Sequence, residues 1–309
     1  MLRKTLVSAG VVIGLSSVSF GQVKLERKFA ENATHVVETT SKIEQKLAIA
    51  GMETDTKSET RATAKSVTGK RDVGGMLRVQ ERVESMRIST EVMGQTYEFD
   101  SASPDNKGSS ALEALREVHK AIAKRASTVV YDKDNRVYAI ESDQDVLAGL
   151  PPELQALVKG QIDPENLKKV ANQELDQLPK EPVSKGDSWQ RTESANFGAG
   201  QIMTFQSKYT YEGTIERDGR TLDRITSKTL SVDFSLQDSP LPLQLKGSQL
   251  KATESEGVIL FDRAAGMVVE HTGSARIVGE ITFAINGMDL PSQLDLKMQS
   301  SVVVKREGK

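Results

Sequence analysis

Histidines are the first side chains to consider, because they most often bind metals or transfer protons near neutral pH. The chain has three of them, His35, His119 and His271. They lie far apart in the sequence and lack the close spacing of zinc ligands. Each shares an apolar stripe or strand face with hydrophobic neighbours. We therefore expect the histidines at the edges of the core, and we expect no metal site.

Carboxylates are the second source of chemistry, with 43 Asp and Glu residues in the chain. The segment 132–135 (Asp-Lys-Asp-Asn) begins like a calcium loop. Such a loop needs a central glycine and a glutamate at its twelfth position. The glycine is missing and a strand pattern resumes at Val137, so we predict a hairpin turn. A hydrolase whose two carboxylates come from distant parts of the chain stays an alternative.

Nucleophiles and cofactor loops are absent from the sequence. There is no cysteine, no Gly-x-Ser-x-Gly motif and no glycine-rich phosphate loop. Acidic and basic residues are interspersed and the net charge is −2, which gives no basic surface for nucleic acid. We therefore predict a protein without catalytic activity, without a cofactor and without a nucleic-acid partner.

The N-terminus predicts export. Residues 1–21 combine a positive start at Arg3 and Lys4 with a short uncharged apolar run, and Ser19 and Gly21 suit signal peptidase. No cysteine follows that would carry a lipid anchor, and no second long apolar run follows that would span a membrane. We expect a periplasmic or extracellular protein without a transmembrane segment after cleavage of the signal peptide.

The cleaved chain, residues 22–309, is long enough for one large domain. We predict a β-rich part at 22–108, a mostly helical part with one hairpin at 109–180, and a second β-rich part at 181–306. One-sided alternation of apolar and polar residues in both β-rich parts is typical of antiparallel sheets with one covered face. The predicted fold class is therefore α+β, with predominantly antiparallel sheet curved around a central helical segment.

Period-two alternation locates the strands. In residues 52–64 one face carries mainly threonine, serine and alanine, and the other face is charged. The pattern predicts strands at 33–49, 52–64, 77–92, 96–99, 203–215, 229–236, 258–261, 267–269, 277–285 and 294–304. Pro240 and Pro242 indicate a loop or a sheet edge.

Helix signals are confined to the middle of the chain. Ser110 and Glu113 form a capping box before an apolar stripe that ends at Ile122. Asp163 followed by a proline predicts the start of another helix within 144–177. A hairpin at 129–140 separates the two helical regions.

Several short motifs occur in one order along the chain. Tyr97-Glu98-Phe99-Asp100-Ser101 ends a strand, a short helix covers 111–125, a hairpin with an acidic turn runs from 129 to 137, and Gly186-Asp187-Ser188-Trp189 follows later. With these motifs the chain resembles a widespread family of exported bacterial proteins of unknown function. The resemblance implies no activity and no catalytic residues. The order of strands and helices also resembles periplasmic lipoprotein-carrier folds, in which a curved sheet wraps helices around an apolar cavity.

The function that we expect is binding of an apolar or amphipathic ligand, a lipid or a lipoprotein segment, in the cell envelope. Small side chains on the neutral face of 52–64 would leave room on a concave sheet, and ligand pockets combine apolar walls with a few polar groups. The candidate apolar wall consists of Phe205, Tyr209, Tyr211, Phe234 and Phe283. The competing interpretation is a solid core, in which these aromatics and Trp189 pack as ordinary core residues.

A second alternative is a non-catalytic structural or interaction protein of the envelope. The long strand from Glu53 to Lys65 has one charged face, and its edge would pair with a partner strand.

Overall fold

The structure is a computed structural model that describes residues 21–49, 51–103, 113–142, 152, 155, 158–159 and 162–307. The predicted signal peptide, apart from Gly21, and the predicted capping residue Ser110 lie outside these residues. None of the described helices combines the length and the hydropathy needed to cross a bilayer.

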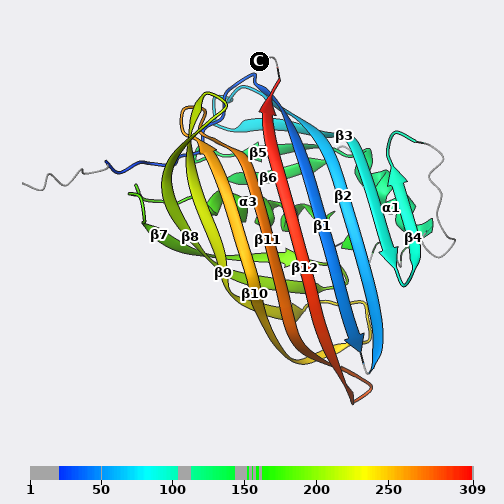
Figure 1. Cartoon of the computed structure of the whole chain (residues 1–309). Helices are drawn as coiled ribbons and strands as arrows, with labels where there is room; N and C mark the ends of the chain where they lie inside the picture. Colours follow the sequence, from blue (N-terminus) through cyan, green and yellow to red (C-terminus); the bar gives the residue numbers. More distant parts are fainter. Residues whose placement is uncertain are drawn as a thin grey trace, which may run out of the picture.

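Twelve strands and two described helices make up the fold (Figure 1). The first part contains β1 (Thr34–Ile49), β2 (Met52–Thr68), β3 (Leu77–Val92), β4 (Gln95–Asp100), α1 (Glu113–Ala123), β5 (Ala126–Tyr131), β6 (Val137–Ser142) and α3 (Pro164–Asp176). The second part contains β7 (Ser188–Asn196), β8 (Gln201–Arg217), β9 (Arg220–Leu236), β10 (Gln244–Asp262), β11 (Met267–Ile285) and β12 (Met288–Arg306).

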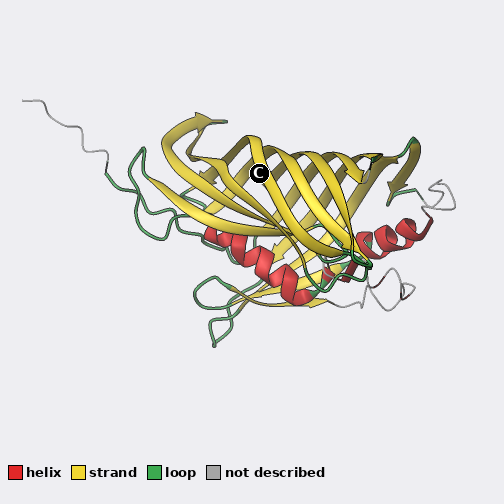
Figure 2. Ribbon diagram, turned by 90° about the horizontal axis from the view of Figure 1, so that it is seen from below, coloured by secondary structure: helices red, strands yellow, loops and turns green. Residues whose placement is uncertain are grey.

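All twelve strands belong to one antiparallel sheet. Its order is β6-β5-β3-β2-β1-β12-β11-β10-β9-β8-β7, and β4 pairs with the far end of β3. The two β-rich parts of the sequence therefore join at β1 and β12, which pair over fifteen residues from His35↔Arg306 to Ile49↔Ser292. Both described helices lie along the same side of the sheet (Figure 2). The predominantly antiparallel fold is confirmed.

Alternation along the strands separates an inner face from an outer face. In β12, Leu294 and Leu296 are buried, while Asp295 and Lys297 between and beside them are ion-paired on the other side. We call the face with Leu294 and Leu296 the inner face. The neutral side of β2 lies on it as well, because Thr54 pairs with Leu47, which in turn pairs with Leu294.

The sheet divides between β9 and β10. These strands pair over only five residues, from Asp223↔Phe261 to Ser227↔Gly257, although each is at least 17 residues long. At the division, Ser255 Oγ accepts a hydrogen bond from the Thr229 backbone N–H (2.9 Å) and so replaces a backbone partner. Beyond this point the lower half of β8 and β9, as seen in Figure 1, packs its inner face against β11 and β12.

Helix α3 contacts both edge strands of the sheet, β6 and β7. Asp163 caps its N-terminus, as predicted, by accepting hydrogen bonds from the backbone N–H groups of Glu165 and Asn166 (both 3.1 Å). The Asn172 amide binds both the N–H and the C=O of Val137 in β6 (3.0 Å each). α3 therefore takes the place of a neighbouring strand at this edge.

Most predicted strands are confirmed, but the last third differs from the prediction. β10 begins at Gln244 rather than near 258, and β11 is continuous from Met267 to Ile285. Bulges between Leu245 and Gly247 and between Ala252 and Glu254 shift the alternation of β10 by one residue each. Such shifts hide a period-two pattern from sequence inspection.

One close approach between β10 and β11 gives a test of the sheet. Gly279 has φ = +152°, and a Cβ atom there would lie 2.0 Å from the Gln249 carbonyl oxygen. We expect Gly279→Ala to lower the free energy of unfolding by about 2 kcal/mol, because backbone must shift. Urea denaturation followed by circular dichroism measures this. Gly247→Ala is the matched control on β10, since nothing lies within 4 Å of its Cβ position. Equal midpoints for the two variants would contradict the close approach.

Candidate functional site

Three of the five predicted ligand-binding aromatics lie together. Phe205, Phe234 and Phe283 belong to the lower cluster, which we define by its buried members Met203, Val232, Phe234, Ile277, Ile281, Phe283, Leu294 and Leu296. Phe234 and Phe283 pack edge to face, with ring centroids 6.1 Å apart. Phe205 is partly buried against the same cluster.

The other two predicted aromatics lie in a separate cluster. Tyr209 and Tyr211 belong to the upper cluster, with Leu25, Leu178, Val183, Ile225, Ile259 and Phe261. Trp189 stacks on Tyr209 (6.0 Å, 12°) and packs against this cluster, which fits the expected core role. The five aromatics thus form two walls rather than one.

A row of small side chains runs across the inner face near the middle of the strands. Strand register places these residues side by side: Thr60, Ser41, Ser300, Gly273, Gly257 and Ser227. The apolar face is therefore interrupted between the two clusters.

Both predicted tyrosines use their hydroxyl groups. Tyr211 donates a hydrogen bond to Asp223 (2.7 Å), whose buried carboxylate also binds the Arg263 guanidinium. Tyr209 donates to Glu193 Oε1 (2.6 Å). Burial, the Asp223 carboxylate and their hydrogen bond raise the pKa of Tyr211 to about 12, and the same kinds of cause raise the pKa of Tyr209. Both stay protonated donors.

The unexpected feature is a set of ionisable groups whose charges act on one another's pKa values. We call it the interior charged cluster; it consists of Glu81, Glu174, Glu193, Arg27, Arg125 and His271. Glu81 lies on the inner face of β3, two residues from buried Val79. Glu174 comes from α3, which lies between the two sheet edges.

Two members of the interior charged cluster are unpaired among the described residues. Neither the Glu81 nor the Glu174 carboxylate accepts a hydrogen bond or forms an ion pair there, and both residues stay accessible to solvent. Surrounding protein nevertheless desolvates them and raises the pKa of each, while Arg27 opposes the shift. Both carboxylates are therefore accessible to solvent and yet partly desolvated by the surrounding protein.

All three histidines, His35, His119 and His271, are partly buried. Burial lowers the pKa of His119 to about 4, and its Nδ1 is hydrogen-bonded to the Tyr97 hydroxyl (2.9 Å) beneath α1. Burial also lowers the pKa of His271, against the opposing charge of Glu193. Within the described part of the chain, no group of three metal-binding side chains forms.

The predicted acidic turn is a hairpin turn. Asp132 Oδ1 accepts hydrogen bonds from the N–H groups of Asp134 and Arg136 (2.9 Å each), and Asn135 adopts φ = +62°. The carboxylate therefore serves the turn itself.

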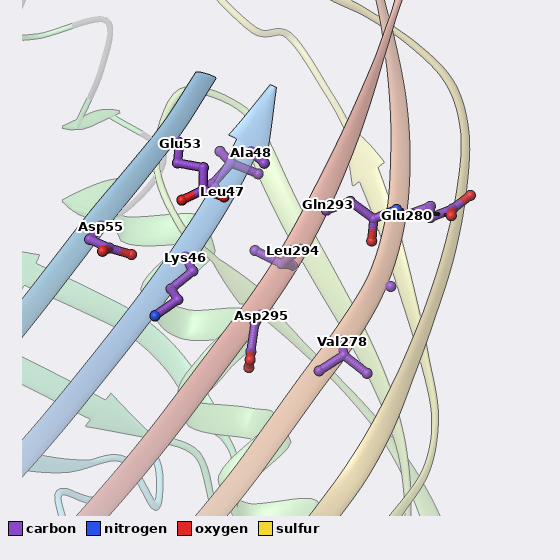
Figure 3. A pocket seen from close by; sticks show the side chains of 11 residues that line it. Lys46, Leu47, Ala48, Glu53, Asp55, Val278, Glu280, Gln293, Leu294 and Asp295 are labelled. Atoms are coloured by element: carbon purple, nitrogen blue, oxygen red, sulfur yellow. Dashed lines mark hydrogen bonds between the residues drawn. The ribbon is translucent and has the colours of Figure 1, made fainter. Parts of the chain in front are cut away.

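A pocket of about 500 Å³ lies at the lower ends of β1, β2, β11 and β12 (Figure 3). Lys46 lies among the carboxylates of Glu53, Asp55, Glu280 and Asp295 on the outer face. Arg276 binds Asp295 in two hydrogen bonds (2.8 and 3.0 Å) and lowers the pKa of that carboxyl. None of the five aromatics lines this pocket, whose lining mixes charged side chains with the apolar Leu47, Val278 and Leu294.

Comparison with known proteins places the chain near a protein family. The model of a family described as "Family of unknown function (DUF6263)" matches residues 75–268. No curated protein matches the chain.

Three solved structures show remote similarity. One is titled "Lipid-protein interactions in lipovitellin" (8% identity, TM-score 0.41, 90% of this chain covered), and the chain spans 25% of that protein. The others are Pseudomonas aeruginosa OccK5 (OpdH) (8%, 0.22, 90% and 99% covered) and an outer membrane channel from Pseudomonas putida F1 (7%, 0.19, 91% and 98% covered). All three TM-scores are below 0.5, so these similarities have no bearing on function.

The raised pKa of Glu81 predicts a pH dependence of stability. Between the unfolded pKa, about 4.5, and the higher folded pKa, the native state binds more protons, so the free energy of unfolding falls as pH rises. Glu81→Gln removes this loss, and we expect it to stabilise the protein at pH 7 but not at pH 4. Urea denaturation at both pH values measures the difference.

The control is Glu91→Gln, on the same strand but opposite Lys57 on the outer face. We expect no gain at pH 7 from this variant. If Glu81→Gln were less stable than the parent at pH 7, the desolvated carboxylate would have to be paired in the native state.

Proposed function

The chain belongs to DUF6263, a family of unknown function, and we propose that it is an exported protein that binds an amphipathic ligand, a lipid or a lipoprotein segment, on the inner face of its sheet. The observation that carries the proposal is the change of character along this face. Its lower half is apolar, and the interior charged cluster with two unpaired carboxylates lies on the same side of the sheet.

The apolar half of the inner face leaves part of its apolar surface accessible. Eight members of the lower cluster are buried, but a further set on the same face is only partly buried: Ile43, Leu47, Phe197, Phe205, Leu243, Leu245, Leu250, Ala252, Leu290 and Met298. Burying apolar surface is worth about 25 cal/mol per Å², so an alkyl chain on these residues gains affinity.

The charged groups at the other end of the inner face would orient the ligand. Ligand pockets place a few polar groups in an apolar lining, and these groups fix the direction of the ligand. Glu81, Glu174 and Arg27 provide both signs of charge, and the charges of Arg27 and Glu81 both act on the Glu174 carboxyl. A ligand with a polar end and an apolar chain matches this arrangement, and the helical segment then covers the ligand against the sheet.

The two carboxylates support binding rather than hydrolysis. Acid–base catalysis by two carboxyl groups uses environments that push their pKa values apart, so that one donates a proton and the other accepts it. Desolvation moves the pKa of Glu81 and that of Glu174 in the same direction. Neither residue is set apart as the base.

Leu250 and Lys251 give a test of the binding face. They are neighbours on β10, with Leu250 partly buried against the lower cluster and Lys251 exposed. Leu250→Asp places a charge among apolar groups, so we expect at least tenfold weaker binding of a fluorescent fatty acid. Lys251→Asp should bind like the parent. Native mass spectrometry of the parent should show co-purified lipid.

Circular dichroism and gel filtration must show that both variants are folded. A parent that gives a clean apo mass and does not bind the fatty acid would refute the proposal. Equal binding by the two variants would place the ligand elsewhere.

Export has its own test. The full-length chain expressed in a bacterial host should be recovered outside the cytoplasm with an N-terminus at Gln22, because signal peptidase cuts after small residues such as Gly21. Mass spectrometry of the intact protein checks this. A cytoplasmic protein that retains Met1 would contradict export and leave the ligand-binding test unaffected.

A further inference from the structure

One strand edge lies open inside the sheet, where the sheet divides. β10 begins at Gln244, but its pairing with β9 starts only at Gly257. Over residues 244–256 the strand is paired with β11 alone. The backbone N–H and C=O groups that point away from β11 therefore have no strand partner within the described chain. An edge of this kind is a template for the addition of another strand.

Two bulges and two lysines limit what can pair with this edge. Lys246 and Thr253 are the bulge residues, which have no register partner on β11. Between them the pairing is regular over residues 247–252. Lys246 and Lys251 are exposed and form no ion pair within the described residues. Bulges and edge lysines protect an edge against unspecific pairing, so a partner strand must be short and must match these charges.

The sequence of β10 itself matches them. When the strand pairs antiparallel with a second copy of itself, a two-fold axis at Leu250 places Lys246 opposite Glu254 of the second copy, and the same pair occurs twice. The Glu254 side chain is 74% exposed, and its ion pair with Arg276 is long (3.8 Å). Arg276 forms two shorter hydrogen bonds with Asp295 (2.8 and 3.0 Å). Glu254 is therefore placed to bind a lysine from outside.

The two faces of the strand select this register. Ser248, Leu250 and Ala252 lie on the inner face, since the first and the last of them pair with buried isoleucines of the lower cluster. The axis at Leu250 sets Ser248 opposite Ala252, inner face to inner face. A shift of the pairing by one residue would set inner residues opposite outer ones. An axis at Lys251 would set two lysines directly opposite each other, and an axis at Gln249 would pair no opposite charges.

We propose that β10 pairs with β10 of a second copy of this chain, antiparallel about a two-fold axis at Leu250, over residues 246–254. A two-fold interface uses the same surface on both copies, so assembly stops at the dimer. The contact is short, and the dimer is therefore weak and forms at high protein concentration. This goes beyond ligand binding on the inner face and does not depend on it.

Charge reversal at the two ends of the contact tests the pairing. Lys246→Glu sets like charges opposite each other at both ends, and so does Glu254→Lys. We expect each variant to dimerise at least tenfold more weakly than the parent. An equimolar mixture of the two variants restores both pairs of opposite charge and should dimerise like the parent, as should the double variant. Sedimentation equilibrium up to about 1 mM protein measures these affinities.

A single cysteine tests the register, because the chain has no cysteine of its own. Residues directly opposite each other have Cβ atoms about 5 Å apart. Leu250→Cys therefore brings two thiols together at the axis, and mild oxidation should give a disulfide-linked dimer. Ser248→Cys is the matched control on the same face of the strand. Its two thiols are offset by about 13 Å along the strands, so it should stay monomeric on a denaturing gel without reductant.

Two further controls separate dimerisation from net charge, folding and ligand binding. Lys180→Glu changes the net charge by the same amount in the segment between α3 and β7, and it should dimerise like the parent. Lys246→Glu should keep the circular dichroism spectrum of the parent. It should also bind the fluorescent fatty acid like the parent, because Lys246 is exposed and does not belong to the lower cluster.

Three results would overturn the proposal: a parent that stays monomeric at about 1 mM, a dimer that survives both charge reversals, or two variants that dimerise no better in mixture than alone. Crosslinking of Ser248→Cys as readily as of Leu250→Cys would equally refute an axis at Leu250.

Discussion

The two free edges of the sheet depend on hydrogen bonds from one turn of α3. Asn172 binds the backbone of Val137 in β6, and Gln173 Oε1 accepts a hydrogen bond from the backbone N–H of Ser194 in β7 (3.1 Å). Unpaired strand edges invite pairing with other chains, and covering them with a helix is one solution. The next residue of the same turn is Glu174. The helix turn that covers both sheet edges therefore also positions the Glu174 carboxylate.

The interior contains two kinds of ionised groups. Asp223 is 1% exposed and is fully paired with Tyr211 and Arg263, as a buried carboxylate must be to offset the loss of its hydration. Glu81 and Glu174 are neither deeply buried nor paired within the described residues, and solvent reaches both. The first kind stabilises the upper cluster. Glu81 and Glu174 form no ion pair within the described residues, and the proposed binding of a ligand rests on these two carboxylates.

Sequence alone predicted the strands with regular alternation and missed those where bulges or small polar residues interrupt it, as in the first half of β10. It placed Phe205, Phe234 and Tyr209 correctly on one covered face. It could not show that they belong to two clusters, because the division between β9 and β10 depends on pairing between distant residues. The sequence did not single out Glu81 and Glu174, because each has the sequence context of a surface carboxylate. Only the fold shows that their charges act on one another.

Glu81 is a position where the local sequence disagrees with the fold. Natural sequences are mostly consistent from residue preference to packing, and exceptions concentrate at functional sites. Glu81 interrupts the inner face of β3, two residues after buried Val79. The lower cluster lies toward the opposite end of the strands, near the β11–β12 turn, since Leu290 lies two residues from Met288. An amphipath bound along this face would place its polar end toward Glu81 and Glu174 and its apolar chain on the lower cluster. No alkyl chain would then have to cross the charged groups, which avoids the desolvation of carboxylates by hydrocarbon.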